Sequence, residues 1–130
     1  MNIKELMSIK LSGVALECKD VKALSKFYLD MLGWEIAFED DGFMSIRSPL
    51  SNVNISFQRN IDYIPPVWPE QENEQQMMLH LDFKADSEEQ MQIMVQHAIS
   101  CGAKKAETQY SDKWTVMTDP AGHPFCIDTL

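Results

Sequence analysis

The sequence predicts an α+β protein made of two similar halves, each with the order strand, helix and three further strands. Three observations support this: two amphipathic helices of matching construction, strand-like runs in the same order around each helix, and an offset between the halves of about half of the 130 residues. We place the first half at about 11–59, a linker at about 60–76 and the second half at about 77–130, all in one domain.

The two predicted helices share one design. The first has Asp20 as its N-cap and ends at Gly33, and the second begins after Ser87. The second ends at Gly102, and Gln90 predicts a capping box with Ser87. An apolar stripe at the spacing of one buried face starts four residues after each cap. The stripes are Leu24, Phe27, Tyr28, Met31 and Leu32 in the first helix and Met91, Met94, Val95, Ala98 and Ile99 in the second.

The predicted strands are short runs rich in β-branched and aromatic residues. Turn signals such as DDG at 40–42 and DPAG at 119–122 separate them. The runs are SGVALEC (12–18), WEIAFE (34–39), FMSIRS (43–48) and NVNISFQ (52–58) in the first half, and MMLHLDF (77–83), KKAET (104–108), WTVMT (114–118) and PFCIDTL (124–130) in the second.

The linker is too rich in proline for regular structure. Pro65, Pro66 and Pro69 exclude a helix or a central strand there. The acidic stretch EQENE is typical of a solvated connection, but Tyr63 and Trp68 are costly to leave in water. We therefore expect the linker to fold back onto the body, over a cleft.

Composition limits the partners and the cellular location that we expect. A net charge of −9 would repel phosphate backbones and anionic lipid surfaces, so no nucleic-acid or membrane partner is expected. The three cysteines form no CxxC pair, which favours reduced thiols. No apolar run is long enough to span a bilayer, and the N-terminus lacks the apolar stretch of a secretory signal. We expect a cytoplasmic protein.

Four sequence pieces then stand in order along the chain: FQR, YIPPVWP, HLDF and DPAGHPFC. With the doubled strand–helix–strand pattern, they make the sequence resemble the vicinal oxygen chelate superfamily of glyoxalase I, bleomycin resistance proteins and extradiol dioxygenases, in particular its small glyoxalase-like domains. The resemblance covers residues 11–130. It implies two βαβββ modules whose curled mixed sheets surround a cavity, and a homodimer in which a second unit covers the exposed sheet.

The resemblance also implies where a metal would bind. Metal-dependent relatives place ligands at the start of the first strand and on the last strand of each half, which correspond here to Gly13, residues 54–56, His80 and Cys126. Gly13 has no donor, and residues 54–56 hold no carboxylate or histidine. His123 is a candidate third donor and ligand contact, although it lies in the turn before the last strand. We expect no metal cofactor, because two donors are too few for the ions that the family favours; if a metal bound, His80 would hold it.

Strand alternation predicts which side chains line the cavity. If His80 faces it, Asp82 does too, while Leu79, Leu81 and Phe83 pack under the helices. By the same rule Gly13, Ala15 and Glu17 of the first strand, and Cys126 and Asp128 of the last strand, face inward.

The carboxylates of Glu17, Asp82 and Asp128 would favour a cationic or amine-bearing ligand, or would supply a general base. Alternatively they lie in water or pair with Lys19, Arg47 or Arg59. His80 is either a ligand contact or a hydrogen-bonded structural histidine, and Cys126 is a plain buried residue rather than a reactive thiol.

Aromatic residues complete the candidate binding surface. Tyr63, Trp68 and Trp114 offer rigid faces for a planar ligand or a cation, whereas Trp34 closes the end of its sheet. Trp68, held between prolines, is expected to contact a ligand or the partner subunit. Gln58 could present its amide to the same cavity.

Three hypotheses follow for the function. The first is a metal-free module that sequesters a small organic molecule, as bleomycin resistance proteins do. The second is a metal-dependent lyase, isomerase or dioxygenase that uses His80. The third is a structural or regulatory dimer with a vestigial cavity. The fold alone does not choose among them.

Overall fold

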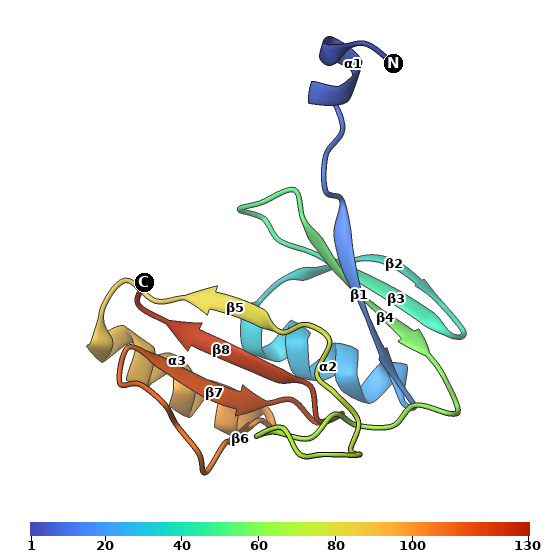
Figure 1. The fold of residues 1–130 in the computed structure, drawn as a ribbon. Helices are drawn as coiled ribbons and strands as arrows, with labels where there is room; N and C mark the ends of the chain where they lie inside the picture. The colour runs from blue at the N-terminus through green and yellow to red at the C-terminus, as the bar shows by residue number, and fades with distance from the viewer.

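Two four-stranded mixed sheets, each covered on one face by a helix, make up the protein (Figure 1). A computed structural model describes residues 1–130. The first sheet has the order β1-β4-β3-β2 and the second β5-β8-β7-β6. The strands are β1 (Gly13–Cys18), β2 (Glu35–Asp40), β3 (Phe43–Arg47), β4 (Asn54–Arg59), β5 (Leu81–Lys84), β6 (Lys104–Lys105), β7 (Trp114–Thr118) and β8 (Pro124–Asp128).

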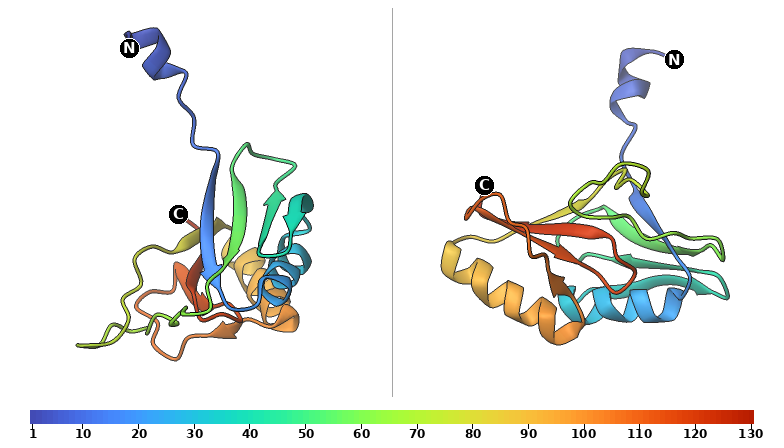
Figure 2. Two further views of the ribbon diagram at one scale, coloured as in Figure 1. Left: turned by 90° about the vertical axis from the view of Figure 1, so that its right-hand side faces the viewer. Right: turned by 60° about the horizontal axis from the view of Figure 1, so that its bottom comes forward.

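β1 pairs with β4 in parallel, as β5 does with β8, and the other pairs are antiparallel. This is the predicted α+β fold of two βαβββ modules. Helices α2 (Val21–Leu32) and α3 (Glu88–Cys101) lie on the same side of the molecule and contact each other (Figure 2). The opposite face of each sheet has no helix over it.

The helix caps agree with the sequence analysis in all but one detail. The Asp20 side chain accepts from the Ala23 amide at 3.0 Å, and Gly33 ends α2 with a φ of 67°. Ser87 accepts from the Gln90 amide at 3.1 Å. The predicted capping box is wrong in its second half, because the Gln90 side chain accepts from the Asp86 amide, one residue outside the cap.

The apolar stripes form the core, except at one end. Leu24, Phe27 and Tyr28 of α2 are buried, as are Met91, Val95 and Ala98 of α3. Ile99, expected in the second stripe, is exposed. It stands about 80° around the helix from Met91, at the margin of the buried face.

Strand β5 begins at Leu81, four residues later than predicted. Leu81 pairs with Phe125, so the next pair toward the linker would use Pro124, which has no N–H to donate to a ladder. Leu79 consequently lies outside the sheet and is 53% exposed instead of packed under a helix.

Strand β6 has two residues where five were predicted. A side chain replaces the rest of its ladder: the Gln109 amide donates to the Ala106 and Val116 carbonyls and accepts from the Val116 amide at 2.8 Å. A short helix, α1 (Ile3–Met7), was not predicted at all. None of the helices is long and apolar enough to cross a membrane.

The buried side chains of both modules form one core of 18 residues. Its polar centre is a bond between the modules, in which the Tyr28 hydroxyl donates to Asp119 Oδ2 at 2.7 Å. The Tyr28 ring stacks on Phe57, with the ring centroids 5.4 Å apart. Asp119 Oδ1 accepts from the amides of Ala121 and His123, which fixes the DPAGH turn.

The linker has no helix or strand and folds back onto this turn, as predicted. The Tyr63 hydroxyl donates to the Ala121 carbonyl at 2.7 Å. Gly122, with a φ of 91°, lies against Pro65 so closely that a Cβ there would stand 3.0 Å from the proline Cβ. The first half of the linker is therefore fixed to the second module.

Replacing Tyr28 with phenylalanine is expected to lower the free energy of unfolding by about 1–3 kcal/mol, because it leaves a buried carboxylate oxygen without its donor. Urea denaturation measures the change. Tyr110→Phe is the matched control, since Tyr110 is largely exposed and its hydroxyl makes no hydrogen bond. Equal stability of the two variants would contradict the structural role of the bond.

Candidate functional site

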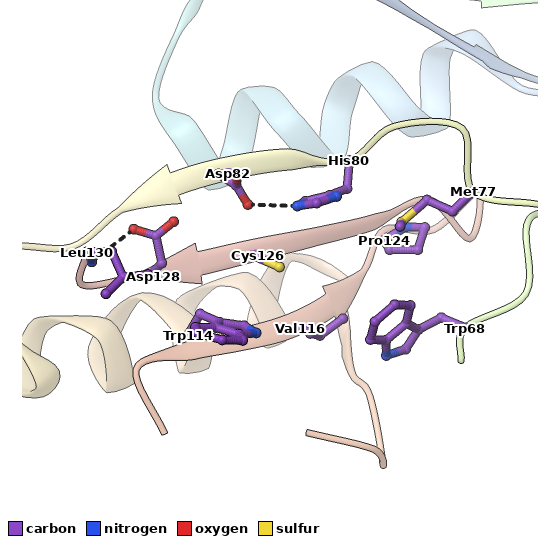
Figure 3. A pocket seen from close by; sticks show the side chains of 10 residues that line it. All are labelled: Trp68, Met77, His80, Asp82, Trp114, Val116, Pro124, Cys126, Asp128 and Leu130. Atoms are coloured by element: carbon purple, nitrogen blue, oxygen red, sulfur yellow. Dashed lines mark hydrogen bonds and ion pairs between the residues drawn. The ribbon is translucent and has the colours of Figure 1, made fainter. Parts of the chain in front are cut away.

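A cavity of about 280 Å³ lies on the face of the second sheet that points away from α3 (Figure 3). Every lining residue comes from the linker or the second module. They are Trp68, Met77, His80, Asp82, Trp114, Val116, Pro124, Cys126, Asp128 and Leu130.

Strand register explains why these side chains meet. Asp82 of β5 pairs with Cys126 of β8, which pairs in turn with Val116 of β7. Asp128 pairs with Trp114. Directly paired residues point to the same face, so three strands contribute to one wall, and the alternate residues of each strand pack toward α3. His80 lies just before β5 and continues the pattern.

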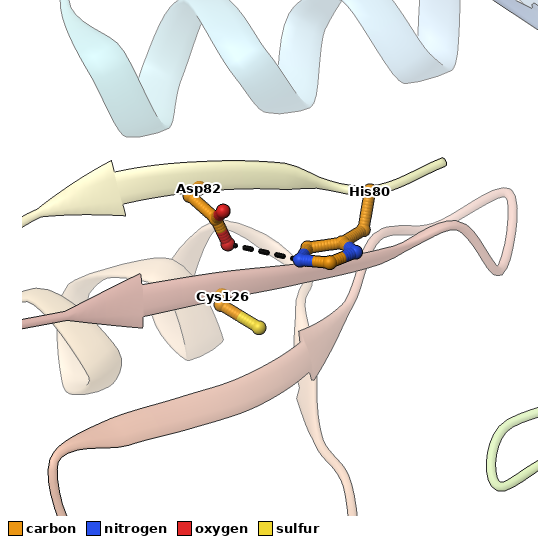
Figure 4. A group of neighbouring side chains, drawn as sticks. All are labelled: His80, Asp82 and Cys126. Carbon is orange, nitrogen blue, oxygen red and sulfur yellow. Dashed lines mark ion pairs between the residues drawn. The ribbon is translucent and has the colours of Figure 1, made fainter.

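The polar centre of the cavity consists of His80, Asp82 and Cys126 (Figure 4). His80 Nε2 lies 3.1 Å from Asp82 Oδ1. A ligating atom of each of the three residues lies within 4.8 Å of the others. His80 and Asp82 are partly exposed while Cys126 is buried, so the group presents its imidazole and carboxylate to the opening.

Burial, together with the carboxylates of Asp82 and Asp128, raises the pKa of the Cys126 thiol to about 11. The thiol therefore keeps its proton at neutral pH, and a protonated thiol is a poor nucleophile. This agrees with the interpretation of Cys126 as a plain buried residue.

Two indole rings form the apolar walls. Trp114 stands at the start of β7, and Trp68 reaches in from the linker at the other end of the cavity (Figure 3). Trp68 meets Tyr110 edge to face, with the centroids 5.8 Å apart. Its indole nitrogen is buried without a hydrogen-bond partner.

Sequence analysis missed four of the lining residues. Val116 and Pro124 share strand parity with Trp114 and Cys126, so the alternation rule could have found them. Leu130 continues the alternation of Cys126 and Asp128 in the predicted run 124–130, so the same rule could have found it as well. Met77 falls on the opposite face of its predicted run from His80, and it lies before β5 in the structure. The contact between Tyr110 and Trp68 had no signal in the sequence.

Three of the predicted site residues lie elsewhere, in a groove between β1 and the linker that we call the linker groove. It has a volume of about 410 Å³, and Glu17, Tyr63 and His123 are among its lining residues. His123 Nε2 donates to the Glu17 carbonyl at 2.7 Å and lies 3.3 Å from the Tyr63 hydroxyl. Here His123 connects the two modules, and Glu17 is not near His80.

Gln58 lines neither the cavity nor the linker groove. It lies exposed on β4, paired with Glu17 across the first sheet. The ten predicted residues therefore divide into six that share the cavity, three in the linker groove and Gln58 on the surface. The six are Trp68, His80, Asp82, Trp114, Cys126 and Asp128.

The acids of the cavity have no lysine or arginine partner. Arg47, one candidate, pairs with Glu35 at 3.1 Å. Neither Lys19 nor Arg59 makes a salt bridge, and Asp82 pairs only with His80. The carboxylates of Asp82 and Asp128 therefore give the cavity a negative wall.

The fold and this open-sheet cavity define a protein of paired βαβββ modules. A sequence model of the glyoxalase-like domain matches residues 13–127, and the chain belongs to that family. No curated protein matches the chain.

Several solved structures have the same fold. A glyoxalase/bleomycin resistance protein/dioxygenase family enzyme from Burkholderia phytofirmans PsJN is 21% identical with a TM-score of 0.71, over 93% of this chain and 98% of that one. A glyoxalase/bleomycin resistance protein from Albidiferax ferrireducens T118 is 21% identical with a TM-score of 0.63, over 92% and 98%. A possible glyoxalase from Bacillus cereus is 16% identical with a TM-score of 0.69, over 93% and 99%.

We expect Cys126 to react slowly with iodoacetamide at pH 8, and its rate to rise as the pH approaches the thiol pKa of about 11. Mass spectrometry of labelled peptides against time and pH measures this. Asp82→Asn removes one of the charges that raise the pKa and should speed the reaction at pH 8. Rapid labelling of Cys126 at pH 7 in the parent protein would show a reactive thiol.

Proposed function

We propose that the chain binds a small planar or cationic organic molecule in the His80 cavity, without a metal, and acts as a sequestering module. The observation that carries the proposal is the lining itself: two indole faces and two carboxylates that no lysine or arginine pairs with, around one opening. An aromatic face attracts a cation through its quadrupole, and a carboxylate nearby adds an ion pair.

The free energies of these contacts are consistent with micromolar binding. An aromatic contact contributes about 0.5–1.5 kcal/mol beyond the area it buries, and a desolvated cation–π contact about 2 kcal/mol. With one ion pair and the burial of a ring, these contributions approach the roughly 8 kcal/mol of a micromolar complex. The cavity volume suits a ligand of one or two fused rings.

Trp68 is the residue expected to respond to the ligand. It comes from the linker rather than from a strand, and its buried N–H has no partner. A buried donor left unsatisfied costs about 1–3 kcal/mol, which an accepting atom on a ligand would remove. The Albidiferax structure, which is that of a glyoxalase/bleomycin resistance protein, supports this argument by analogy.

Trp68→Ala and Asp82→Asn are each expected to weaken binding about tenfold or more, since one removes an aromatic wall and the other a carboxylate. The probes are N-methylquinolinium, neutral naphthalene and anionic naphthalene sulfonate, followed by tryptophan quenching and thermal shift. We expect the order of affinity cation, neutral, anion.

The control variants are Phe38→Ala and Asp41→Asn, both exposed on the first module and distant from the cavity. They should bind like the parent. If all four variants bind every probe equally, the cavity is not the ligand site, and the hypothesis of a structural or regulatory dimer gains.

A metal-dependent enzyme is the second candidate, because His80, Asp82 and Cys126 converge. Three donors of nitrogen, oxygen and sulfur fit a zinc-type ion, which would supply a Lewis acid with open positions. They do not fit the oxygen-rich, octahedral sites of magnesium or manganese. Against this candidate, no residue of the first module lines the cavity, and the His80 imidazole already pairs with Asp82.

Elemental analysis of protein purified without chelator separates the two candidates. We expect metal well below one equivalent per chain, unchanged in His80→Ala. The matched control is His97→Ala, because the exposed His97 instead donates to the Asp30 and Met31 carbonyls at the end of α2. Stoichiometric zinc, nickel or iron that is lost in His80→Ala and kept in His97→Ala would establish the metal site.

A further inference from the structure

Trp68 reaches the cavity from a part of the linker that has no polar attachment to the rest of the chain. No hydrogen bond or salt bridge joins residues 64–79 to another part of the protein. Bonds within this segment, such as that from the Val67 amide to the Gln75 carbonyl at 3.0 Å, only close the segment on itself. Hydrogen bonds therefore do not explain why Trp68 lies over the second sheet.

Outside the linker, Trp68 has one aromatic partner, Tyr110, in the loop between β6 and β7 (residues 106–113). The two rings meet edge to face, with the centroids 5.8 Å apart and an angle of 77° between the ring planes. The Trp68 N–H is buried without an acceptor, so it adds no directional bond. Tyr110 is 67% exposed, and its ring supplies the interaction. Such a pair favours the closed arrangement about two- to tenfold beyond the area that it buries.

Gln109, the neighbour of Tyr110, fixes this loop to the sheet. Its Oε1 accepts from the Val116 amide at 2.8 Å, and its Nε2 donates to the carbonyls of Val116 at 2.8 Å and Ala106 at 2.9 Å. The side chain thus binds both polar groups of Val116, as a paired strand would. A carboxylate could not replace the amide, because it lacks the N–H donors. Val116 itself lines the cavity, so the loop is joined to the cavity wall.

We propose that Gln109 and Tyr110 form a latch, in which Gln109 fixes the loop and Tyr110 holds Trp68 over the His80 cavity, so that the pair sets how long a ligand stays bound. Neither residue is among those that line the cavity, so both are positioning residues that act through Trp68. The effect on the ligand rests on the proposed function. The hold on Trp68 does not, because the ring contact exists in the ligand-free protein.

The latch joins two segments that are distant in the chain. Trp68 stands at one end of the cavity, and Trp114 and Asp128 stand at the other (Figure 3). No hydrogen bond connects the linker segment to the β6–β7 loop, so Trp68 can move aside without breaking a polar bond. Separation of the two rings is then the step that opens this end of the cavity. The strength of the ring contact decides the fraction of time for which that end is closed.

Fluorine NMR of the full chain labelled with 5-fluorotryptophan tests the hold on Trp68 without any ligand. The chain has three tryptophans, so three resonances are expected, and Trp68→Phe assigns one of them. Tyr110→Ser and Gln109→Glu should each move the Trp68 resonance toward its position in urea, because both free the indole. The resonance of Trp34, which packs against the core beside the first module, should stay in place, as a general loss of structure would not allow.

Two further variants are matched controls. Tyr110→Phe keeps the ring and should leave the Trp68 resonance as it is in the parent. Glu107→Gln changes an exposed side chain of the same loop and should do the same. A Trp68 resonance that Tyr110→Ser and Gln109→Glu leave unmoved would overturn the proposal, and so would one that Tyr110→Phe moves equally.

The rate of ligand dissociation tests the second part of the proposal. N-methylquinolinium is the probe, and stopped-flow dilution followed by tryptophan fluorescence measures its release. We expect release to be about two- to tenfold faster in Tyr110→Ser and in Gln109→Glu, and unchanged in Tyr110→Phe. In the Trp68→Ala background, Tyr110→Ser should have no further effect, because the latch acts through the indole.

Equal release rates from the parent and from both latch variants would overturn the effect on the ligand. An effect of Tyr110→Ser that persists in the Trp68→Ala background would also overturn it, because Tyr110 would then act by another route. If N-methylquinolinium fails to bind even the parent, the proposed function fails, and the fluorine spectra still decide whether Gln109 and Tyr110 hold Trp68.

Discussion

The buried bond between Tyr28 and Asp119 is the constraint on which the rest of the structure depends. It joins the helix of the first module to the DPAGH turn of the second across the centre of a shared core. Burial raises the pKa of Asp119 above its ordinary value of 3.8, although the charge interaction with His123 and the hydrogen bonds from Tyr28 and the turn amides oppose the shift. The native state thus holds this proton where the unfolded chain has lost it, so this group alone makes folding less favourable as pH rises above that value.

From this turn the linker takes its position. The Ala121 carbonyl, fixed by Asp119, accepts from Tyr63, and His123 reaches across to the Glu17 carbonyl. The linker is consequently anchored at its start on the junction of the modules, while its later part runs over the second sheet and brings Trp68 to the cavity. The anchored linker therefore lies between the cavity and the linker groove, which have different linings. The cavity has an aromatic and acidic lining on a single sheet, and the linker groove lies between the modules.

Much of the fold followed from local chemistry. Both helices, their caps at Asp20 and Ser87, and most strands are where the residue pattern predicts them. The errors come from interactions that residue periodicity does not predict. Pro124 ends the ladder before His80, and the Gln109 side chain replaces the end of β6. In the candidate site, period-two alternation placed His80, Asp82, Cys126 and Asp128 together because paired strands in register share a face. It could not tell that Glu17, predicted to face inward from the first module, lines the linker groove and not the cavity of the second sheet.

By itself, the sequence determined the two-module α+β fold, the family resemblance and the face on which each strand residue lies, since these depend on periodicity, turn residues and motifs within each half. The tertiary structure decided how the halves combine. It divided the predicted residues between the cavity and the linker groove, made His123 a contact between modules and left residues 1–12 exposed. These outcomes depend on contacts between residues distant in the chain, such as Tyr28 with Asp119, and on the path of a linker whose prolines exclude regular structure without specifying its direction.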